Sequence, residues 1–453
     1  SMKKISFILF LFIFAKFCSA QNLHKISAMD AKADMNELIN TIKSVHFNAF
    51  HKIDEYKIHE KKDSIFQTWS SDSISYRAFT KSGMQLTSFM SNGHTSFDWQ
   101  NPLLFPELTS SVFLPVKVKL AKNQLVVTKS YSAQIKKGEV ISTINDQDAV
   151  LLFRDVMSLT GGITPFREVV SEKLFPFYLF FFLKESVGYK IKIDKGEEKY
   201  IPGISVQEVF KFIQSEISRK NYTFEVIEGD VGLMSYNKCE DYDAFSIFLD
   251  STFQQISSNG INKLIIDLRF NSGGNSSLND KLLSYLTRKK YRQSSGRYWK
   301  VSKEVKHKIK IDSLWSDFLD QPFLSKYLAS NNNEALNEID YSRTKNSKPA
   351  HYFRGKHCFL IGPFTFSSAN YLADAIKTFS LSTLIGASTG ELTNDFGEQV
   401  EFQLSNSKSY FFVPTTYDIG ANKNESIMTP VAPDIYSEEK TLDSAIKYLT
   451  KKR

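Results

Sequence analysis

The chain has 453 residues, of which 42% are hydrophobic and 23% charged, a composition that fits a folded globular protein and excludes a disordered one. At about 100–200 residues per domain, this length allows two to four domains. With only 20 glycines and 12 prolines, collagen-like and proline-rich low-complexity classes are also excluded.

The first 20 residues have the pattern of a secretory signal peptide. Lys3 and Lys4 precede an apolar run over residues 5–15, and the segment closes on Ala20, after which we expect cleavage. The run is too short for a membrane span, which needs about 20 residues. A lipid anchor at Cys18 is the lesser alternative. The pattern therefore predicts a secreted or periplasmic protein.

Without the three lysines of this segment, which has no acid, the net charge falls from +8 to +5. So mild an excess does not indicate a nucleic-acid partner. It fits a solvated surface or a weak association with an anionic envelope. The sequence leaves open whether Cys239 and Cys358 form a disulfide or stay buried thiols, and it leaves the oligomeric state open too.

Residues 21–105 have helical periodicity. Apolar residues lie on one helical face over residues 28–47, and a second helix is expected around residues 76–90. The sequence therefore predicts a helical N-terminal region that follows the signal peptide.

A β-rich unit is predicted next, over residues 106–200, with its strands within 110–160. Residues 116–120 alternate between apolar and polar side chains as a half-buried strand does, and a helix is expected from Ala149. The unit ends in a Phe-rich extension, residues 174–183, which holds five of the 38 phenylalanines. This run is too short to span a membrane, so it indicates either a buried or domain-interface helix or an exposed aromatic patch for an apolar ligand.

Strands and helices alternate over residues 201–453, which predicts a layered α/β domain. Strands are expected at residues 231–236, 263–268, 358–361 and 384–386, and helices at 244–258, 277–286 and 367–379. No element is assigned to a polar, lysine-rich stretch at about residues 288–350.

The motifs of several enzyme classes are missing from the sequence. There is no Gly-rich dinucleotide-binding or phosphate-binding loop, no Cys-x-x-Cys pair and no Gly-x-Ser-x-Gly elbow, and no second histidine follows His59-Glu60 one turn later. A dehydrogenase, a kinase, a zinc peptidase and an ordinary α/β-hydrolase are therefore disfavoured. We expect neither a metal nor an organic cofactor.

Two segments end predicted buried strands with residues that a catalytic site needs. In residues 267–274 (DLRFNSGG), the pair Gly273 and Gly274 lets the backbone approach another group closely. In residues 364–369 (FTFSSA), Ser367 starts a helix, where unpaired N–H groups can stabilise an oxyanion. Taken singly, the first segment is also typical of a turn and the second of a helix-capping serine.

Together the two segments resemble those of the C-terminal processing (tail-specific) serine peptidases and their tricorn-type relatives. Residues 384–390 (LIGASTG) and 431–435 (VAPDI) are similar to the closing segments of that family. Upstream, residues 113–115 (FLP) and 138–145 (GEVISTIN) look like its PDZ-like module. The likeness is close over residues 225–440 and weaker before them.

The resemblance implies an α/β peptidase core of the crotonase-like (spiral) type, with a helical N-terminal region and a PDZ-like β-rich module. Ser367 would be the nucleophile. Backbone N–H groups of Ser368 and of Gly273 or Gly274 would form the oxyanion hole. The PDZ-like module would bind an extended peptide at a sheet edge.

The group that activates Ser367 distinguishes two subtypes of this family. Processing peptidases carry a Lys about 25 residues after the nucleophile, but residues 388–393 (STGELT) contain none. Tricorn-type members use a His from the N-terminal region, and residues 92–95 (NGHT) resemble their segment, which makes His94 the expected general base. A neutral imidazole with a pKa of about 6.5 can take the serine proton and return it to the leaving amine.

For the acid that orients His94, the spacing favours Glu425, 58 residues after Ser367, with Glu398 as the rival. Tricorn-type enzymes place a Ser just before this His, whereas here Gly93 stands there. This departure leaves a slow or inactive enzyme open.

The sequence therefore predicts a secreted serine endopeptidase that acts on a peptide or protein substrate through an acyl-enzyme. Two alternatives stay open. One is a non-catalytic protein on the same scaffold that binds a peptide or, through the Phe-rich extension, an apolar ligand. The other is a secreted esterase or amidase with the same nucleophile.

Overall fold

The computed structural model describes residues 25–451 except 70, 91, 184–186, 195, 218, 313–320 and 345–346. The signal peptide expected at residues 1–20 lies outside these residues and stays a prediction. None of the helices in the described ranges is long and apolar enough to cross a membrane.

The N-terminal region is helical, as predicted. It contains β1 (Lys25–Ser27), α2 (Ala28–Val45), α3 (Glu55–Gln67), β2 (Ser73–Ser75) and α4 (Tyr76–Phe89). The hydroxyl of Ser27 caps α2 by accepting the N–H of Asp30, and Ser75 caps α4 in the same way. Helix α2 buries one apolar face, made of Met35, Leu38, Ile39, Ile42 and Val45.

The β-rich unit predicted after this region is present. Short elements lead into it: β3 (Ser96–Phe97), η2 (Pro102–Leu104), α5 (Phe105–Ser110) and β4 (Val112–Phe113). Its own elements are β5 (Val116–Ala121), β6 (Gln124–Ser130), β7 (Val140–Ile144), β8 (Gln147–Asp148), α6 (Ala149–Met157), α7 (Thr164–Leu179), β9 (Gly188–Ile193) and β10 (Glu198–Pro202). The sheet runs in the order β10-β9-β7-β6-β5, with β8 on β7, so β5 is an edge strand, and α7 packs against it.

The Phe-rich extension is mostly interior. It forms the last turns of α7 and the turn that follows, and Phe175, Phe177, Phe180 and Phe181 are all buried. Their rings pack against Phe113, Phe153 and each other. The buried-helix interpretation therefore holds, and the exposed aromatic patch loses its basis.

The core is the α/β domain predicted from the alternation. Its elements are β12 (Tyr222–Glu228), β13 (Val231–Tyr236), α9 (Tyr242–Ser258), β14 (Lys263–Asp267), α10 (Ser277–Leu286), β17 (Lys356–Ile361), α14 (Ser368–Phe379), β18 (Thr383–Gly386), β21 (Ile435–Tyr436) and α15 (Thr441–Thr450), and β11 (Ile204–Ser205) and α8 (Val206–Ile217) lead into it. The sheet order is β12-β13-β14-β17-β18-β21, parallel from β13 onward.

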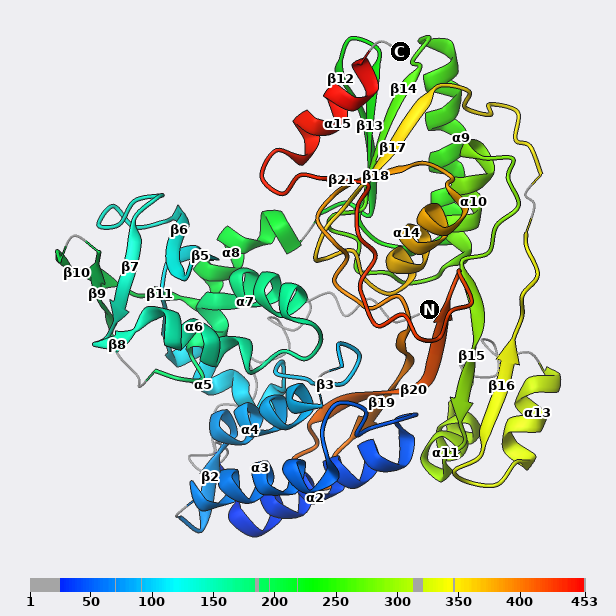
Figure 1. Ribbon diagram of the computed structural model, residues 1–453. Helices are drawn as coiled ribbons and strands as arrows, with labels where there is room; N and C mark the ends of the chain where they lie inside the picture. Colours follow the sequence, from blue (N-terminus) through cyan, green and yellow to red (C-terminus); the bar gives the residue numbers. More distant parts are fainter. Residues whose placement is uncertain are drawn as a thin grey trace.

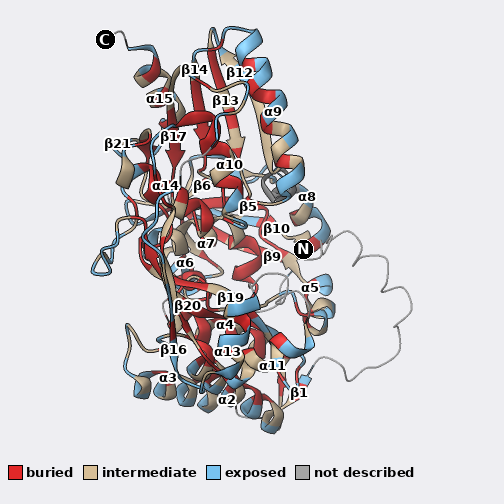
Figure 2. Ribbon diagram, turned by 90° about the vertical axis from the view of Figure 1, so that its right-hand side faces the viewer, coloured by how far each residue is buried: buried red, intermediate tan, exposed pale blue. Residues whose placement is uncertain are grey.

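Helices cover both faces of this sheet, which explains why its central strands are continuously apolar. In β14, Leu264 and Ile266 face α9, α10 and α14, whereas Ile265 faces α15. Figure 1 shows α15 on the opposite side of the sheet from α9 and α10, and Figure 2 shows the strands between them buried. Cys239 and Cys358 are both buried free thiols, which answers the disulfide question for this structure.

A second sheet is absent from the sequence prediction. It comprises β15 (Ser294–Lys300), β16 (Ala335–Ile339), β19 (Asp395–Gln403) and β20 (Tyr410–Gly420) in the order β16-β15-β20-β19, and β3 pairs with β20. Helices α11 (Lys303–Ile311) and α13 (Gln321–Ala329) accompany it within the stretch to which no element was assigned. Polar side chains on the outer strands hide the alternation there.

This second sheet joins the N-terminal helices to the core. In Figure 1 the long strands β19 and β20 run from the core down to α2. One apolar cluster includes Leu38 of α2, Phe177 of α7 and Val413 of β20. The joint is also polar: the fully buried carboxylate of Asp34 accepts hydrogen bonds from the turn between β19 and β20, namely from Asn406 N (3.0 Å), Asn406 Nδ2 (2.8 Å) and Ser407 N (2.7 Å).

We predict that Asp34→Ala lowers the free energy of unfolding by about 2–4 kcal/mol, because three donors at this joint lose their acceptor. The matched control is Glu37→Ala, one turn later on α2. Glu37 accepts from the N–H and hydroxyl of Ser405 at the surface, so its loss is expected to cost less than about 1 kcal/mol. Denaturant unfolding followed by circular dichroism measures both, and equal losses would contradict the account.

Candidate active site

Ser367 lies where the chain leaves β17 and turns into α14. Its backbone has φ 53° and ψ −125°, a conformation that side chains other than glycine rarely adopt, so it is strained. Although Ser367 occupies the N-cap position of α14, its hydroxyl makes no capping hydrogen bond. The Ser367 side chain therefore does not cap α14.

The two glycines after β14 lie against this serine. Gly273 and Gly274 have φ values of 94° and 131°. A Cβ atom on Gly273 would lie 2.6 Å from Cβ of Ser367 and 3.0 Å from the backbone N of Ser368. The glycine pair is thus required for close approach, as the sequence indicated.

Two backbone N–H groups at this contact, those of Gly274 and Ser368, have no acceptor among the residues that the structure describes. The N–H of Gly273 donates to Oδ1 of Asn271 at 2.9 Å and is already used. The Ser368 hydroxyl donates to the carbonyl of Gly274 at 2.5 Å, which holds the start of α14 against the glycine turn. Of the expected donors, Gly274 and Ser368 are therefore the better placed, and Gly273 serves the turn itself.

His94 reaches the same place from the loop between α4 and β3. The amide of Asn92 accepts the N–H of His94 at 2.9 Å and donates to Oδ1 of Asp395 at 2.9 Å. Gln399 donates to the carbonyl of His94 at 2.6 Å. Contacts to β19 therefore fix both sides of the histidine backbone.

Gly93 has a steric explanation in this structure. A Cβ atom on Gly93 would lie only 2.7 Å from Cζ of Phe366, the residue before Ser367. The rings of Phe366 and His94 are 4.8 Å apart. Because the Phe366 ring fills the space that a serine side chain would need, the departure from the tricorn-type pattern matches a change in packing.

A carboxylate that the sequence prediction missed joins the two segments. Oε1 of Glu391 lies 3.2 Å from Nδ1 of His94, although the ring nitrogen is not aligned as a hydrogen bond. The other oxygen, Oε2, accepts the backbone N–H of Ser367 at 2.5 Å. The Glu391 carboxyl group therefore contacts both His94 and Ser367, the two residues expected to be catalytic.

Burial is the largest cause of the pKa shifts of His94, Glu391 and Asp395. It lowers the pKa of His94 to about 4, against smaller upward effects of Glu398 and of the Phe396 carbonyl. Burial also raises the pKa of Glu391 well above its ordinary range, and the nearby carboxyl of Asp395 raises it further. The pKa of Asp395 is itself raised by burial to about 6. Two buried carboxyl groups therefore influence each other beside the histidine.

The two acids favoured by spacing lie elsewhere. Glu425, in the loop past the end of β20, is exposed and accepts a hydrogen bond from the hydroxyl of Tyr298 at 3.1 Å. Glu398 forms an ion pair with Arg297 and acts on His94 only through its charge. Neither contacts His94 in the described part of the chain, and the acid beside His94 is Glu391. The spacing along the sequence favoured Glu425. However, β20 carries Glu425 beyond the point where β3 and the His94 loop meet the sheet, so Glu425 lies away from His94.

A sequence signal for Glu391 did exist. It follows Ser367 by 24 residues, which is where processing peptidases carry their Lys. This chain has an acidic residue, Glu391, at that spacing.

A cleft of about 730 Å³ opens beside this group, between the β-rich unit and the core. Ser272 and Phe366, the neighbours of Gly273 and Ser367, both line it, as do Lys117 of β5 and Glu172 of α7. The cleft therefore adjoins the Ser367 segment, although Ser367 and His94 are not among its lining residues.

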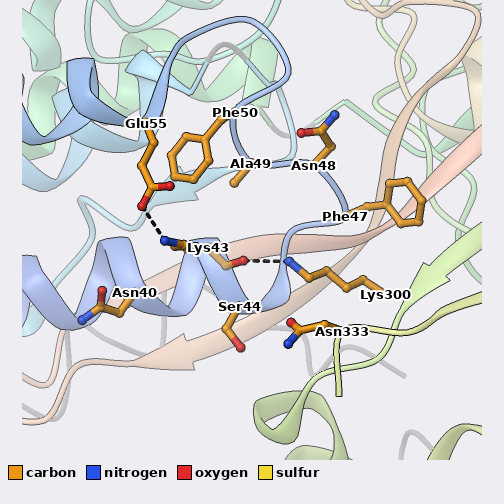
Figure 3. Close-up of a pocket in the computed structure, with 10 residues that line it drawn as sticks. All are labelled: Asn40, Lys43, Ser44, Phe47, Asn48, Ala49, Phe50, Glu55, Lys300 and Asn333. Carbon is orange, nitrogen blue, oxygen red and sulfur yellow. Dashed lines mark hydrogen bonds and ion pairs between the residues drawn. The ribbon is translucent and has the colours of Figure 1, made fainter. Parts of the chain in front are cut away.

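A smaller cavity, of about 470 Å³, lies at the end of α2 and is shown in Figure 3. Its wall includes an ion pair between Lys43 and Glu55. Lys300 of β15 donates to the carbonyls of Lys43 (2.7 Å) and His46 (3.0 Å), which caps the last turn of the helix. None of the residues around Ser367 lines this cavity, and its polar groups serve the junction between α2 and β15.

Metal ligation is not indicated at this site. In the described ranges, no three His, Cys, Asp or Glu side chains are grouped so that they could hold a metal ion. The contacts found here are those of Glu391 with the His94 ring and with the Ser367 backbone.

Residues 230–437 match the sequence profile of peptidase family S41. Solved structures of CPAF have a similar fold. A CPAF mutant gives a TM-score of 0.63 at 14% identity over 94% of this chain and 95% of that chain, and mature CPAF gives 0.60 at 14% identity over 94% and 96%. Mature CPAF complexed with lactacystin gives 0.60 at 13% identity over 93% and 97%. No curated protein matches the sequence.

Proposed function

The chain belongs to peptidase family S41, the serine peptidases of the C-terminal processing type, and from this premise we propose that Ser367 is its nucleophile and His94 its general base. Nε2 of His94 takes the hydroxyl proton as Ser367 attacks a peptide carbonyl. An acyl-enzyme forms, the leaving amine receives the proton, and water completes hydrolysis. The N–H groups of Gly274 and Ser368 stabilise the oxyanion.

One observation carries this proposal: the Glu391 carboxyl group contacts both His94 Nδ1 and the Ser367 backbone. Because Nδ1 faces Glu391, Nε2 is the ring nitrogen left to accept the serine proton. An ionised Glu391 fixes the proton on Nδ1 and stabilises the imidazolium that forms during attack. Glu391 therefore takes the role that spacing had given to Glu425.

The alternatives are weaker than this proposal. An apolar-ligand protein would need the Phe-rich extension at its surface, and four of its five rings are buried. An esterase or amidase would use the same nucleophile, so acyl esters belong beside peptides in the first assays.

Export and peptide docking are also proposed. Lys3, Lys4 and the apolar run over residues 5–15 support secretion, and N-terminal sequencing of the mature protein would then begin after Ala20. The edge strand β5 is the part of the β-rich unit that could bind an extended peptide in the PDZ-like manner.

We predict that a fluorophosphonate probe labels the wild-type protein at Ser367 and does not label Ser367→Ala. His94→Ala should slow both labelling and peptide hydrolysis by roughly 10³-fold or more, because the hydroxyl loses its base. Mass spectrometry of the labelled peptide gives the site. A folded wild-type protein that stays unlabelled, or equal labelling of Ser367→Ala, would refute the nucleophile.

Glu391→Gln is expected to lower kcat by about 10²–10⁴-fold, because a neutral amide does not stabilise the imidazolium. The matched control, Glu425→Gln, should change kcat less than about 2-fold, since Glu425 lies at the surface on Tyr298. Steady-state hydrolysis with circular dichroism of both variants decides between the two acids. A large loss in Glu425→Gln with none in Glu391→Gln would reverse the assignment.

The pH profile follows from the raised pKa of Glu391. The active form needs neutral His94 and ionised Glu391, so kcat/KM should rise with pH as Glu391 loses its proton. Asp395→Asn removes the negative charge that raises this pKa, which favours ionised Glu391 and should move the acid limb to lower pH. Asp155→Asn, an exposed change on α6, should leave the limb unmoved. A limb that stays in place in Asp395→Asn would contradict the coupling.

A further inference from the structure

The proposed oxyanion hole depends on the direction of one peptide unit. The N–H of Gly274 belongs to the peptide bond between Gly273 and Gly274, and both of these glycines have positive φ. Because glycine adopts either sign of φ with little cost, such a unit can turn over and present its carbonyl in place of its N–H. Contacts from outside the turn must therefore fix its direction.

Cys239, just after β13, fixes this peptide unit through its backbone. Its N–H donates to the carbonyl of Gly273 at 2.9 Å, and its own carbonyl accepts the N–H of Asn275 at 2.7 Å. Cys239 and Gly274 thus form an isolated parallel bridge. In a trans peptide unit the C=O and N–H groups point in opposite directions, so the bond to the Gly273 carbonyl directs the Gly274 N–H away from Cys239.

The other donor, the N–H of Ser368, lies on a different element and has its own support. The Ser368 hydroxyl donates to the Gly274 carbonyl, which joins α14 to the glycine turn. The Ser368 carbonyl accepts a hydrogen bond from Nδ2 of Asn279 at 2.8 Å. Because Asn279 belongs to α10, the first residue of α14 is held from two sides.

Asn279 connects these two supports, and its side chain is fully buried. Its Oδ1 accepts the hydroxyl of Tyr236, the last residue of β13, at 3.1 Å and lies 3.7 Å from Sγ of Cys239. The second proton of Nδ2 goes to Oε1 of Gln293 at 2.8 Å. Since a carbonyl can only accept, Nδ2 must face Ser368, and Oδ1 then faces the segment after β13.

A second fully buried asparagine, Asn271, completes the network on the glycine side. Its Oδ1 accepts the N–H of Gly273 at 2.9 Å, and its Nδ2 donates to the carbonyl of Tyr236 at 2.9 Å. Sγ of Cys239 lies 3.6 Å from the same Oδ1. Buried polar groups paired in this way hold one geometry, because a rearrangement would leave a group without its partner.

We propose that Asn279 is a positioning residue for catalysis, which ties the Ser368 end of the oxyanion hole to the segment that directs the Gly274 N–H. The inference rests on the proposed function, because it concerns the same oxyanion hole. Asn279 acts through these two donors. An oxyanion hole that is fixed before the reaction stabilises the transition state without a cost of reorganisation.

Asn279→Ala removes the amide that joins the two supports. The maximal rate of fluorophosphonate labelling at Ser367 should fall by about 10- to 100-fold, somewhat less than the loss of an oxyanion donor itself. The probe concentration that gives half of this rate should stay unchanged, since the hole acts on the transition state rather than on the bound probe. The acid limb of the pH profile should not move, because His94 and Glu391 are left intact.

Phosphorus NMR of the phosphonylated protein gives a readout that loss of stability alone does not move. The phosphonyl oxygen occupies the place of the oxyanion, so the phosphorus resonance responds to the N–H groups of Gly274 and Ser368. This resonance should shift in Asn279→Ala relative to the wild type, with circular dichroism showing that the variant is folded.

Tyr236→Phe keeps the test decisive should the alanine variant fail to fold. It preserves the buried ring and removes only the hydroxyl that holds Oδ1 of Asn279, so labelling should slow by about 3- to 5-fold. The matched control is Tyr285→Phe. Tyr285 is also buried and lies on α10, but its hydroxyl donates to Asp250 of α9, and labelling should match the wild type. Equal losses in the two tyrosine variants would mean general destabilisation and overturn the proposal.

The wild-type protein separates this inference from the proposed function. If it is labelled at Ser367 while folded Asn279→Ala is labelled at the same rate with an unshifted resonance, the positioning role alone is refuted. If the wild type stays unlabelled, the proposed function fails and the positioning role fails with it.

Discussion

The contact on which this structure depends is the bridge that Glu391 makes between two segments 273 residues apart, those of His94 and Ser367. His94 comes from the helical N-terminal region and Ser367 from the end of a core strand. Neither segment is a catalytic site alone. A buried carboxyl group contacts both segments, and burial lowers the pKa of His94 and raises the pKa of Glu391.

The rest of the fold supports that contact. The second sheet carries β19 and β20 from the core to α2, and along the way Asp395 and Gln399 hold the loop of Asn92 and His94. At its far end, Asp34 of α2 accepts the backbone of the β19–β20 turn. The strained backbone of Ser367 can persist because the glycine turn, the start of α14 and Glu391 all hold it.

Local patterns in the sequence predicted most of the core. Continuous apolar strands such as β14 and the serine at a strand–helix junction follow from short-range rules, because both sheet faces are covered there. Ser367 and His94 were predicted through a family resemblance, and the structure brings their segments together.

What the sequence did not reveal depends on long-range pairing. Strand β15 is largely polar and gains its place by pairing with β20, which is distant in the sequence, and β16 pairs with β15, so no local period marks these two strands. Long-range pairing also explains why the sequence predicted the wrong acid beside His94. Spacing from Ser367 favoured Glu425, but three-dimensional proximity is set by where β3 joins β20, and that brings Glu391 to His94.

The most direct test of this account is a crystal structure of the protein with a phosphonyl group bound from a fluorophosphonate. The account predicts the phosphorus on Oγ of Ser367, its oxygen within hydrogen-bond distance of the N–H groups of Gly274 and Ser368, and Glu391 in contact with Nδ1 of His94. A phosphonyl group on another residue, or a His94 ring that contacts Glu425 instead of Glu391, would contradict it.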